Sequence, residues 1–202
     1  MYKVFVNDKP IILSDLAVST SEYEIYLFKN TGFEEIIHKL QNTKVPGIYI
    51  YYNDLDTLWD KFKDFFEIVK AAGGVVENDK GELLFIRRNE RWDFPKGRME
   101  LGEVNRETAL REVAEECDIS ETEIIDDLAI TYHVYQDFGK FKLKKTYWYW
   151  MKSNDLGVPC PQKEEGITEA VFIAADKWEQ MYPDMYANIK ELVIKFKNIK
   201  GI

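Results

Sequence analysis

The sequence predicts an α+β protein made of two consecutive parts. Segments rich in β-branched and aromatic residues alternate with segments whose apolar residues recur every three or four positions, as on one face of a helix. The pattern changes at Gly73-Gly74, after which hairpin-like segments follow one another. We therefore expect a small α+β domain at residues 1–70 and a second domain at residues 71–202. Apolar residues make up 46% of the 202, which is enough for a core in each.

In the first part, alternating and continuous apolar runs predict strands, and apolar residues on one face predict two helices. The strands are expected at residues 2–6, 10–13, 22–28 and 47–52, and the first helix at residues 32–41 with Thr31 as its cap. The second helix would be capped by Asp54 or Asp56. Because Trp59, Phe62, Phe66 and Val69 recur at helical spacing, this helix is expected to continue to Gly73-Gly74.

The second part begins with a predicted hairpin around the turn at residues 79–82. The other elements expected here are a helix at residues 104–117, a long hairpin formed by residues 129–138 and 141–152, a strand at residues 168–175, and a last helix capped by Asp184. Between the first hairpin and the helix lies WDFPKGRMELGE, residues 92–103. Its two glycines have the spacing of a phosphate-binding loop, but Glu103 stands where such a loop carries Lys.

Composition excludes several classes of protein. A net charge of −9 argues against a general nucleic-acid binder or a protein of anionic membrane surfaces. No apolar run reaches the roughly 18 residues of a membrane span, and the amino terminus lacks a leader pattern, so we expect a cytoplasmic protein. Cys117 and Cys160 are too few for a zinc ribbon or a disulfide framework, and both are expected to be reduced.

The helix at residues 104–117 carries the chemistry. Leu110, Val113, Ala114 and Cys117 form an apolar stripe, and three glutamates, at positions 112, 115 and 116, gather on the other side with Arg111 at their edge. A charged face of this kind is usually just solvated. Like charges one turn apart repel by about 0.2–0.5 kcal/mol per pair, however, and a divalent cation would remove the conflict. Oxygen ligands without His or Cys favour Mg²⁺ or Mn²⁺ over zinc.

These residues resemble the Nudix box. The matching positions are Gly97, then after five residues Glu103, then after seven residues Arg111-Glu112-Val113-Ala114-Glu115-Glu116-Cys117-Asp118-Ile119. The one departure is Asp118, which stands where the box has Gly. Since that position ends a helix in the left-handed region, which Asp tolerates, we expect a less stable helix end and unchanged chemistry.

The resemblance implies an αβα sandwich around a mixed sheet in the second domain, and a metal-dependent hydrolase. The expected substrate is a small molecule with a diphosphate linkage, of the nucleoside diphosphate-X type. Carried onto this chain, the box implies that Glu112, Glu115 and Glu116 bind Mg²⁺ or Mn²⁺, that Arg111 orients Glu112, and that Glu103 and the Gly97 carbonyl complete the site. For the general base, Glu112 and Glu165 both stay open.

Several basic and aromatic residues near the box are candidates for substrate binding. Lys96 is the first choice for a phosphate contact, while Arg88 and Arg98 are equally well explained as surface charges, and Trp92 is a candidate for stacking. Phe94, Tyr132, Tyr147 and Tyr149 could also stack a base, but aromatic residues in alternating strands are more often in the core. We interpret His38 and His133 as structural. WDFPKG is similar to the loop of Nudix enzymes that act on diadenosine or diphosphoinositol polyphosphates, so a dinucleoside polyphosphate is one expected substrate.

Three functions compete at this point. The leading one is a Mg²⁺-dependent pyrophosphohydrolase, because every box carboxylate is present. The alternative is a sensor that binds a nucleotide or sugar-nucleotide without turnover and signals through residues 1–70. The third is a metal-free domain with an acidic helix. The first domain offers no chemical motif, so homodimer formation, substrate capping and partner binding are all open roles for it.

Overall fold

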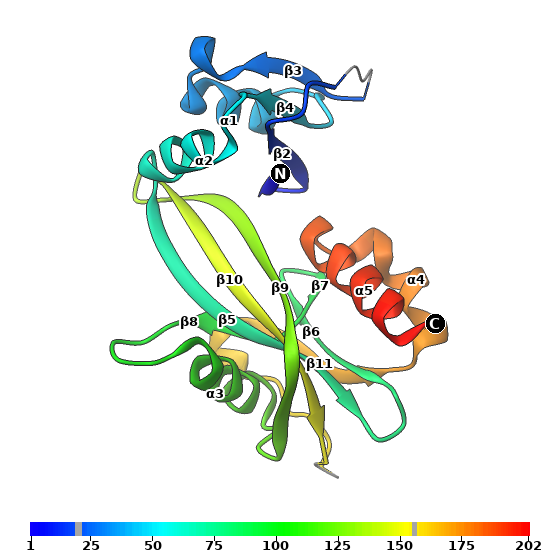
Figure 1. Cartoon of the computed structure of the whole chain (residues 1–202). Helices are drawn as coiled ribbons and strands as arrows, with labels where there is room; N and C mark the ends of the chain where they lie inside the picture. Colours follow the sequence, from blue (N-terminus) through cyan, green and yellow to red (C-terminus); the bar gives the residue numbers. More distant parts are fainter. Residues whose placement is uncertain (19–21, 155–156) are drawn as a thin grey trace. The chain divides into compact units, whose positions relative to one another are not determined.

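The computed structural model describes residues 1–18, 22–154 and 157–202, and it divides the chain into two compact units (Figure 1). The first unit comprises Met1–Val69 together with Thr131–Lys145, and the second comprises Lys70–Ile130 together with Thr146–Ile202. The long hairpin of β9 (Thr122–Asp137) and β10 (Lys140–Ser153) therefore contributes residues to both. Within the described residues, we find no helix with the length and apolar character needed to cross a membrane.

The first unit is a mixed sheet with two helices packed against it. Its elements are β1 (Tyr2–Val6), β2 (Lys9–Ser14), β3 (Glu24–Leu27), α1 (Phe33–Asn42), β4 (Ile48–Tyr51) and α2 (Leu55–Asp64), with a 3-10 turn, η1 (Phe28–Asn30), between β3 and α1. β1 and β2 are antiparallel, whereas β2 and β3 both run parallel to β4. The helices bury Ile37 and Phe62 against the sheet, so this unit has its own core.

The predicted extent of the second helix is wrong. α2 ends at Asp64, and the chain then enters β5 (Glu67–Asn78), which includes Val69 and both glycines. The apolar spacing from Trp59 to Val69 fits a helix, but the segment after Phe66 contains several β-branched residues and forms the first part of the long strand β5. Tertiary pairing outweighs a local pattern here.

Two predicted caps are also wrong, and one is confirmed. α1 has Gly32 as its N-cap, while the Thr31 hydroxyl donates to the Leu27 carbonyl at 2.8 Å. The last helix, α5 (Ala187–Lys200), begins after Tyr186, because Asp184 belongs to a separate 3-10 turn, η4 (Tyr182–Asp184). Asp54 does cap α2, since its carboxylate accepts the backbone N–H of Thr57 at 3.1 Å.

The second unit is an αβα sandwich, as the resemblance implies. Its strands lie in the order β11-β6-β5-β10-β9, where β6 is Leu83–Arg88 and β11 is Ile167–Ile173. α3 (Asn105–Cys117) covers one face, and α5 covers the other together with the short helix α4 (Trp178–Met181), which follows a 3-10 turn, η3 (Ala175–Lys177) (Figure 1). Two separate clusters of buried side chains fill the layers, so both faces of the sheet are covered.

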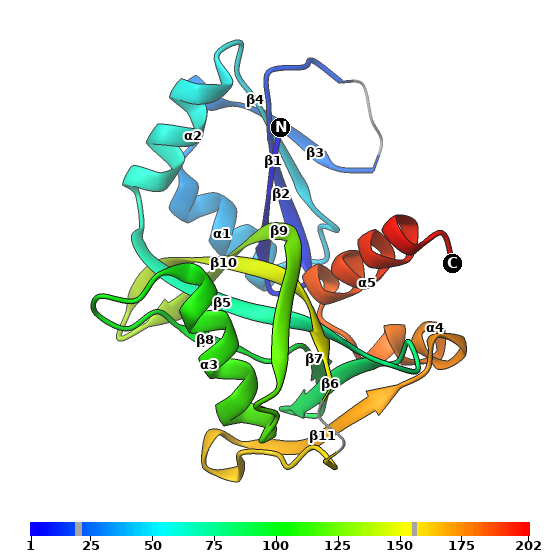
Figure 2. The ribbon, with the colours of Figure 1, turned by 60° about the horizontal axis from the view of Figure 1, so that its bottom comes forward.

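Two short strands that the sequence does not predict bring the loop of residues 92–103 to α3. β7 (Arg91–Asp93) pairs antiparallel with β6, and β8 (Lys96–Arg98) pairs antiparallel with β5. Figure 2 shows β8 beside α3. Three residues are too few for a periodic signal, so only the long-range pairing reveals these strands.

Asp118 ends α3 in the left-handed region, with φ 54° and ψ 39°, which confirms the backbone conformation expected at this position. Because Gly adopts this conformation without the steric cost of a Cβ, Asp118→Gly should raise the free energy of unfolding by about 0.5–1 kcal/mol. Denaturant unfolding of the variant checks this, with Asp118→Ala expected to change stability in the opposite direction. A destabilised Gly variant would mean that the Asp side chain itself holds the helix end.

Candidate functional site

α3 presents its carboxylates at the border of its buried face. Ala109, Val113 and Cys117 are fully buried against the sheet, and Glu112 and Glu116 are buried as well, with 8% and 1% exposure. The sequence placed both glutamates on the side away from the core, and of the three glutamates only Glu115 is exposed. β8 covers this side of α3, which explains the difference. Two carboxylates one turn apart are therefore removed from bulk solvent.

Gly97 in β8 is required by its contact with Glu112. A Cβ built on Gly97 would lie 2.0 Å from Oε2 of Glu112, far inside van der Waals contact. The glycine thus lets the backbone of β8 approach the carboxylate directly. This places the Gly97 backbone beside Glu112, as expected if its carbonyl belongs to the same site.

Arg111 connects most of the remaining acidic residues. Its guanidinium donates to both oxygens of Glu103, at 2.7 and 2.9 Å, and to Glu112 and Glu115, each at 2.8 Å. It also donates to the Arg98 carbonyl at 3.1 Å, which joins α3 to the end of β8. The hydrogen bonds from Arg111 lower the pKa of Glu103 to about 2, so this carboxylate stays ionised at neutral pH. The fork of Arg111 thereby fixes the orientation of Glu112.

Glu116 has a different environment. Its Oε2 accepts the backbone N–H of Lys96 at 2.8 Å, and its Oε1 lies 3.8 Å from Nη1 of Arg88. Burial nevertheless raises the pKa of Glu116 to about 7, and burial also raises the pKa of Glu112. The positive charges of the chain therefore do not fully offset the cost of burying the carboxylates of Glu112 and Glu116.

Lys96 does not point toward open solvent. Its ammonium forms an ion pair with Asp93, and its side chain is only 16% exposed. Burial opposes the charged form of Lys96, but the carboxylates of Asp93 and Glu116 outweigh it and raise the pKa of the ammonium. Sequence reasoning missed Asp93. The signal available was its spacing of three residues from Lys96 across a Pro-containing corner.

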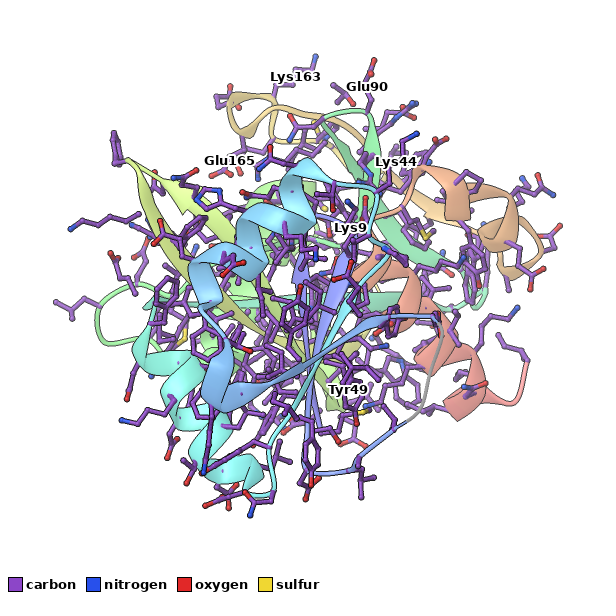
Figure 3. The ribbon with its side chains drawn as sticks, turned by 90° about the horizontal axis from the view of Figure 1, so that it is seen from above. Lys9, Lys44, Tyr49, Glu90, Lys163 and Glu165 are labelled. Carbon is purple, nitrogen blue, oxygen red and sulfur yellow. The ribbon has the colours of Figure 1, made fainter. Side chains whose placement is uncertain are left out.

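Glu165 reaches the same cluster from the loop before β11. It ends the 3-10 turn η2 (Lys163–Glu165), and its Oε2 lies 3.4 Å from Nη1 of Arg88. Figure 3 shows Glu165 and Lys163 on this loop, with Lys163 pointing away from the protein. The loop is tied to the end of α3, because the N–H of Gln162 donates to the Glu116 carbonyl at 3.1 Å. Arg88 therefore stands between Glu116 and Glu165.

The structure does not bring every candidate to this cluster. Trp92 pairs with Arg87 across β6 and β7, and its ring packs against Phe85 in the core between the sheet and α5, on the face opposite α3. The side chain of Arg98 is exposed at the end of β8. Phe94 and Tyr149 are buried, as expected of core aromatics, and Cys117 and Cys160 are both free thiols.

The donor set fits a hard divalent cation. In the described part of the chain, the potential ligands that meet here are carboxylate and backbone oxygens, and the closeness of Gly97 to Glu112 leaves no room for a side chain at position 97. Among residues 1–18, 22–154 and 157–202, however, no three His, Cys, Asp or Glu side chains already converge as metal ligands. Instead, Arg111 holds Glu103 and Glu115. Arg111 also binds Oε1 of Glu112, so the Oε2 atom of Glu112 and the carboxylate of Glu116 are the first positions for ligands. Glu115 could join them if its side chain rotated away from Arg111.

Arg111→Lys tests this arrangement, because it keeps the positive charge and removes the planar fork that binds three carboxylates. Partners that orient metal ligands typically contribute 10–100-fold to metal affinity or activity. We expect Mg²⁺ binding about 10–100-fold weaker, measured by calorimetry on the substrate-free protein. Lys197→Arg is a suitable control, since Lys197 pairs with Glu179 on the far face. An unchanged affinity in Arg111→Lys would show that Glu112 does not depend on Arg111.

Comparison with known proteins agrees with this geometry. A family model described as the NUDIX domain matches residues 68–195. An Ap4A hydrolase from C. elegans, solved as a binary complex, is 24% identical, with a TM-score of 0.53 over 66% of this chain and 98% of that chain. The MutT protein from Methanosarcina mazei Go1 is 20% identical, with a TM-score of 0.53 over 67% and 96%. A NUDIX hydrolase from Nitrosomonas europaea is 18% identical, with a TM-score of 0.51 over 65% and 90%.

The likeness to these structures shows a shared fold, and the family match covers more than half of the chain. The chain therefore belongs to the NUDIX domain family, and the resemblance drawn from Gly97 to Ile119 is confirmed. It is a Nudix hydrolase, an enzyme of the class that acts on phosphorus-containing anhydrides.

Proposed function

We propose that this protein is a Mg²⁺-dependent pyrophosphohydrolase that cleaves the diphosphate linkage of a nucleoside diphosphate joined to a second group. The observation that carries the proposal is the carboxylate set of α3, with Glu112 and Glu116 buried one turn apart and Arg111 holding Glu103, Glu112 and Glu115. A family member that only senses a ligand has no need of this costly arrangement of buried negative charge.

Each residue has a distinct part in the proposed reaction. Glu112, Glu116 and Glu115 would hold the cation, and Arg111 keeps Glu112 in place. When bound, Mg²⁺ or Mn²⁺ would neutralise charge on the diphosphate oxygens and make a coordinated water more acidic. The backbone N–H of Lys96 and the close approach of Gly97 fix Glu116 and Glu112 relative to each other.

We assign Glu165 as the general base and Arg88 as the phosphate contact. Glu165 is 48% exposed and makes no short hydrogen bond to Arg88, so it is free to accept a proton, whereas Glu112 is held by Arg111. Arg88 is 37% exposed beside both Glu116 and Glu165. A guanidinium in this position can bind a phosphate group in two-point fashion.

A nucleotide substrate is supported by two independent features. WDFPKG is similar to the loop of enzymes that act on diadenosine or diphosphoinositol polyphosphates, and one structural neighbour is an Ap4A hydrolase. The net charge of −9 supports a small-molecule substrate over general nucleic-acid binding. We therefore propose a dinucleoside polyphosphate as the first substrate to test. A cytoplasmic location and a homodimer stay predictions from the sequence.

The proposal is tested by product release from a panel that contains diadenosine tetraphosphate, a sugar nucleotide, a nucleoside triphosphate and a diphosphoinositol polyphosphate, each with Mg²⁺. Hydrolysis of a nucleotide member between two phosphorus atoms is expected. Turnover of the inositol compound alone would replace the nucleotide assignment. Tight binding of a nucleotide without turnover of any member would favour the sensor instead.

The assignment of the base predicts a specific effect of Glu165→Gln. Positioned acid-base groups contribute about 10²–10⁴-fold, so kcat should fall by that factor. The matched control is Glu164→Gln, which removes an exposed carboxylate from the adjacent position of the same turn. A kcat of Glu165→Gln close to that of the wild type would transfer the role to Glu112.

A further inference from the structure

Asp93 and Lys96 form a buried ion pair next to the carboxylates of the candidate site. Asp93 is 5% exposed, and its Oδ2 pairs with the ammonium of Lys96. Its other oxygen, Oδ1, accepts the backbone N–H of Phe94 at 2.8 Å. Buried ion pairs often contribute little net stability, because the cost of desolvating both charges offsets their attraction. Stability alone is therefore a weak reason for charges at this place.

The pair closes the corner between β7 and β8. Asp93 is the last residue of β7 and Lys96 the first of β8, so their side chains span the two-residue connection Phe94-Pro95. The corner is anchored on both sides, because the Phe94 ring stacks on Phe85 at 4.7 Å between centroids and the Pro95 carbonyl accepts the N–H of Gly74 at 3.1 Å. The ion pair completes a rigid turn.

This corner places the backbone of β8 against the carboxylates of Glu116 and Glu112. The N–H of Lys96 donates to Glu116 at 2.8 Å, and the next residue, Gly97, lies against Glu112. A rotation at the corner would move both contacts together, since they belong to consecutive residues. The ammonium of Lys96 is paired with Asp93. We therefore interpret Lys96 as a residue that holds the loop in place and not as one that binds the substrate.

We propose that Asp93 is a positioning residue of the cation site, which acts by holding Lys96 so that β8 keeps Glu112 and Glu116 aligned to bind a divalent cation. The inference rests on the proposed function, because it concerns the same site. In this proposal, the segment WDFPKG supports the carboxylates of α3 and does not itself bind the substrate.

The experiment is Mg²⁺ binding to the substrate-free protein by calorimetry, followed by kcat at saturating Mg²⁺. Asp93→Asn keeps the size of the side chain and an oxygen for the Phe94 N–H but loses the charge that holds Lys96. We expect Mg²⁺ affinity to fall 10–100-fold, in line with other partners that orient ligands, and kcat at saturating Mg²⁺ to stay within about threefold.

The matched control is Glu77→Gln. Glu77 is also a buried carboxylate paired with a lysine, since Lys200 lies 2.9 Å from it, and the Trp150 indole donates to it at 3.1 Å. It lies away from the carboxylates of α3, in contact with α5. Glu77→Gln should reduce thermal stability while leaving Mg²⁺ affinity unchanged, which separates a general loss of stability from a loss of alignment.

Mg²⁺ affinity in Asp93→Asn equal to that of the wild type would overturn the inference and leave the proposed function intact. No Mg²⁺ binding by the wild type would overturn both. If Asp93→Asn does not fold, the double variant Asp93→Ala, Lys96→Ala removes both charges and the contact between the two side chains, and serves the same test. Wild-type affinity in the double variant would then show that the pair does not align the site.

Discussion

Glu116→Gln is expected to slow hydrolysis about 10³-fold while making the cation-free protein more stable at neutral and alkaline pH. Loss of a carboxylate ligand removes several kcal/mol of charge stabilisation in the transition state. With 1.36 kcal/mol for each factor of ten, about 4 kcal/mol corresponds to a rate about 10³-fold lower. Product release on the best substrate of the panel measures this loss.

The gain in stability follows from the direction of the pKa shift. Burial raises the pKa of Glu116 from 4.5 to about 7 in the folded protein. The unfolded chain therefore releases this proton first, and wild-type stability falls as the pH rises from 4.5 to 7. Above pH 7 the loss reaches about 3 kcal/mol, and the Gln side chain, which has no charge, avoids it while still accepting the Lys96 N–H.

Denaturant unfolding of both proteins in a chelating buffer at pH 5 and pH 8 measures this effect. The variant should exceed the wild type by a larger margin at pH 8 than at pH 5. Addition of Mg²⁺ should stabilise the wild type more than the variant. An equal difference in unfolding free energy between the two proteins at both pH values would mean that burial does not raise the pKa of Glu116.

Gly97→Ala should disrupt both stability and activity. The added Cβ would lie 2.0 Å from Glu112, so either β8 or the carboxylate must move. Overpacking of this kind typically costs about 1–3 kcal/mol of unfolding free energy. Since a displacement of about 1 Å at an active site can reduce the rate about 10²-fold, kcat/KM should fall by at least that factor.

The matched control is Gly32→Ala. A Cβ at Gly32 has no neighbour nearer than Glu35 Cβ at 3.9 Å. Thermal unfolding and kcat/KM of this variant should stay close to the wild type. If Gly97→Ala retained full activity, the closeness of β8 to Glu112 would have no part in the reaction.

The features that were predictable from the sequence depend on local patterns. The helix at residues 104–117 was found within one residue of its bounds, because apolar spacing and the box both lie within one segment. The left-handed end at Asp118 follows from its position in the same motif. The αβα sandwich came from the resemblance to a family, which a chain of alternating strands and helices alone does not specify.

The rest depended on contacts between distant segments. Burial of Glu112 and Glu116 results from β8, which forms only because it pairs with β5. The extension of β5 back to Glu67 overrode a helical pattern for the same reason. The Asp93–Lys96 pair becomes visible only once β7 and β8 meet at a corner. A helical wheel drawn for α3 alone could not include any of these neighbours.

The most direct test of the central claim is the dependence of both hydrolysis and thermal stability on Mg²⁺ concentration, measured on the same samples of wild type, Glu116→Gln and Glu164→Gln. We expect Mg²⁺ to stabilise the wild type and Glu164→Gln and to turn on their hydrolysis over the same concentration range, while both responses are much weaker in Glu116→Gln. Hydrolysis that persists in a chelating buffer, or an equal response to Mg²⁺ in Glu116→Gln, would contradict it.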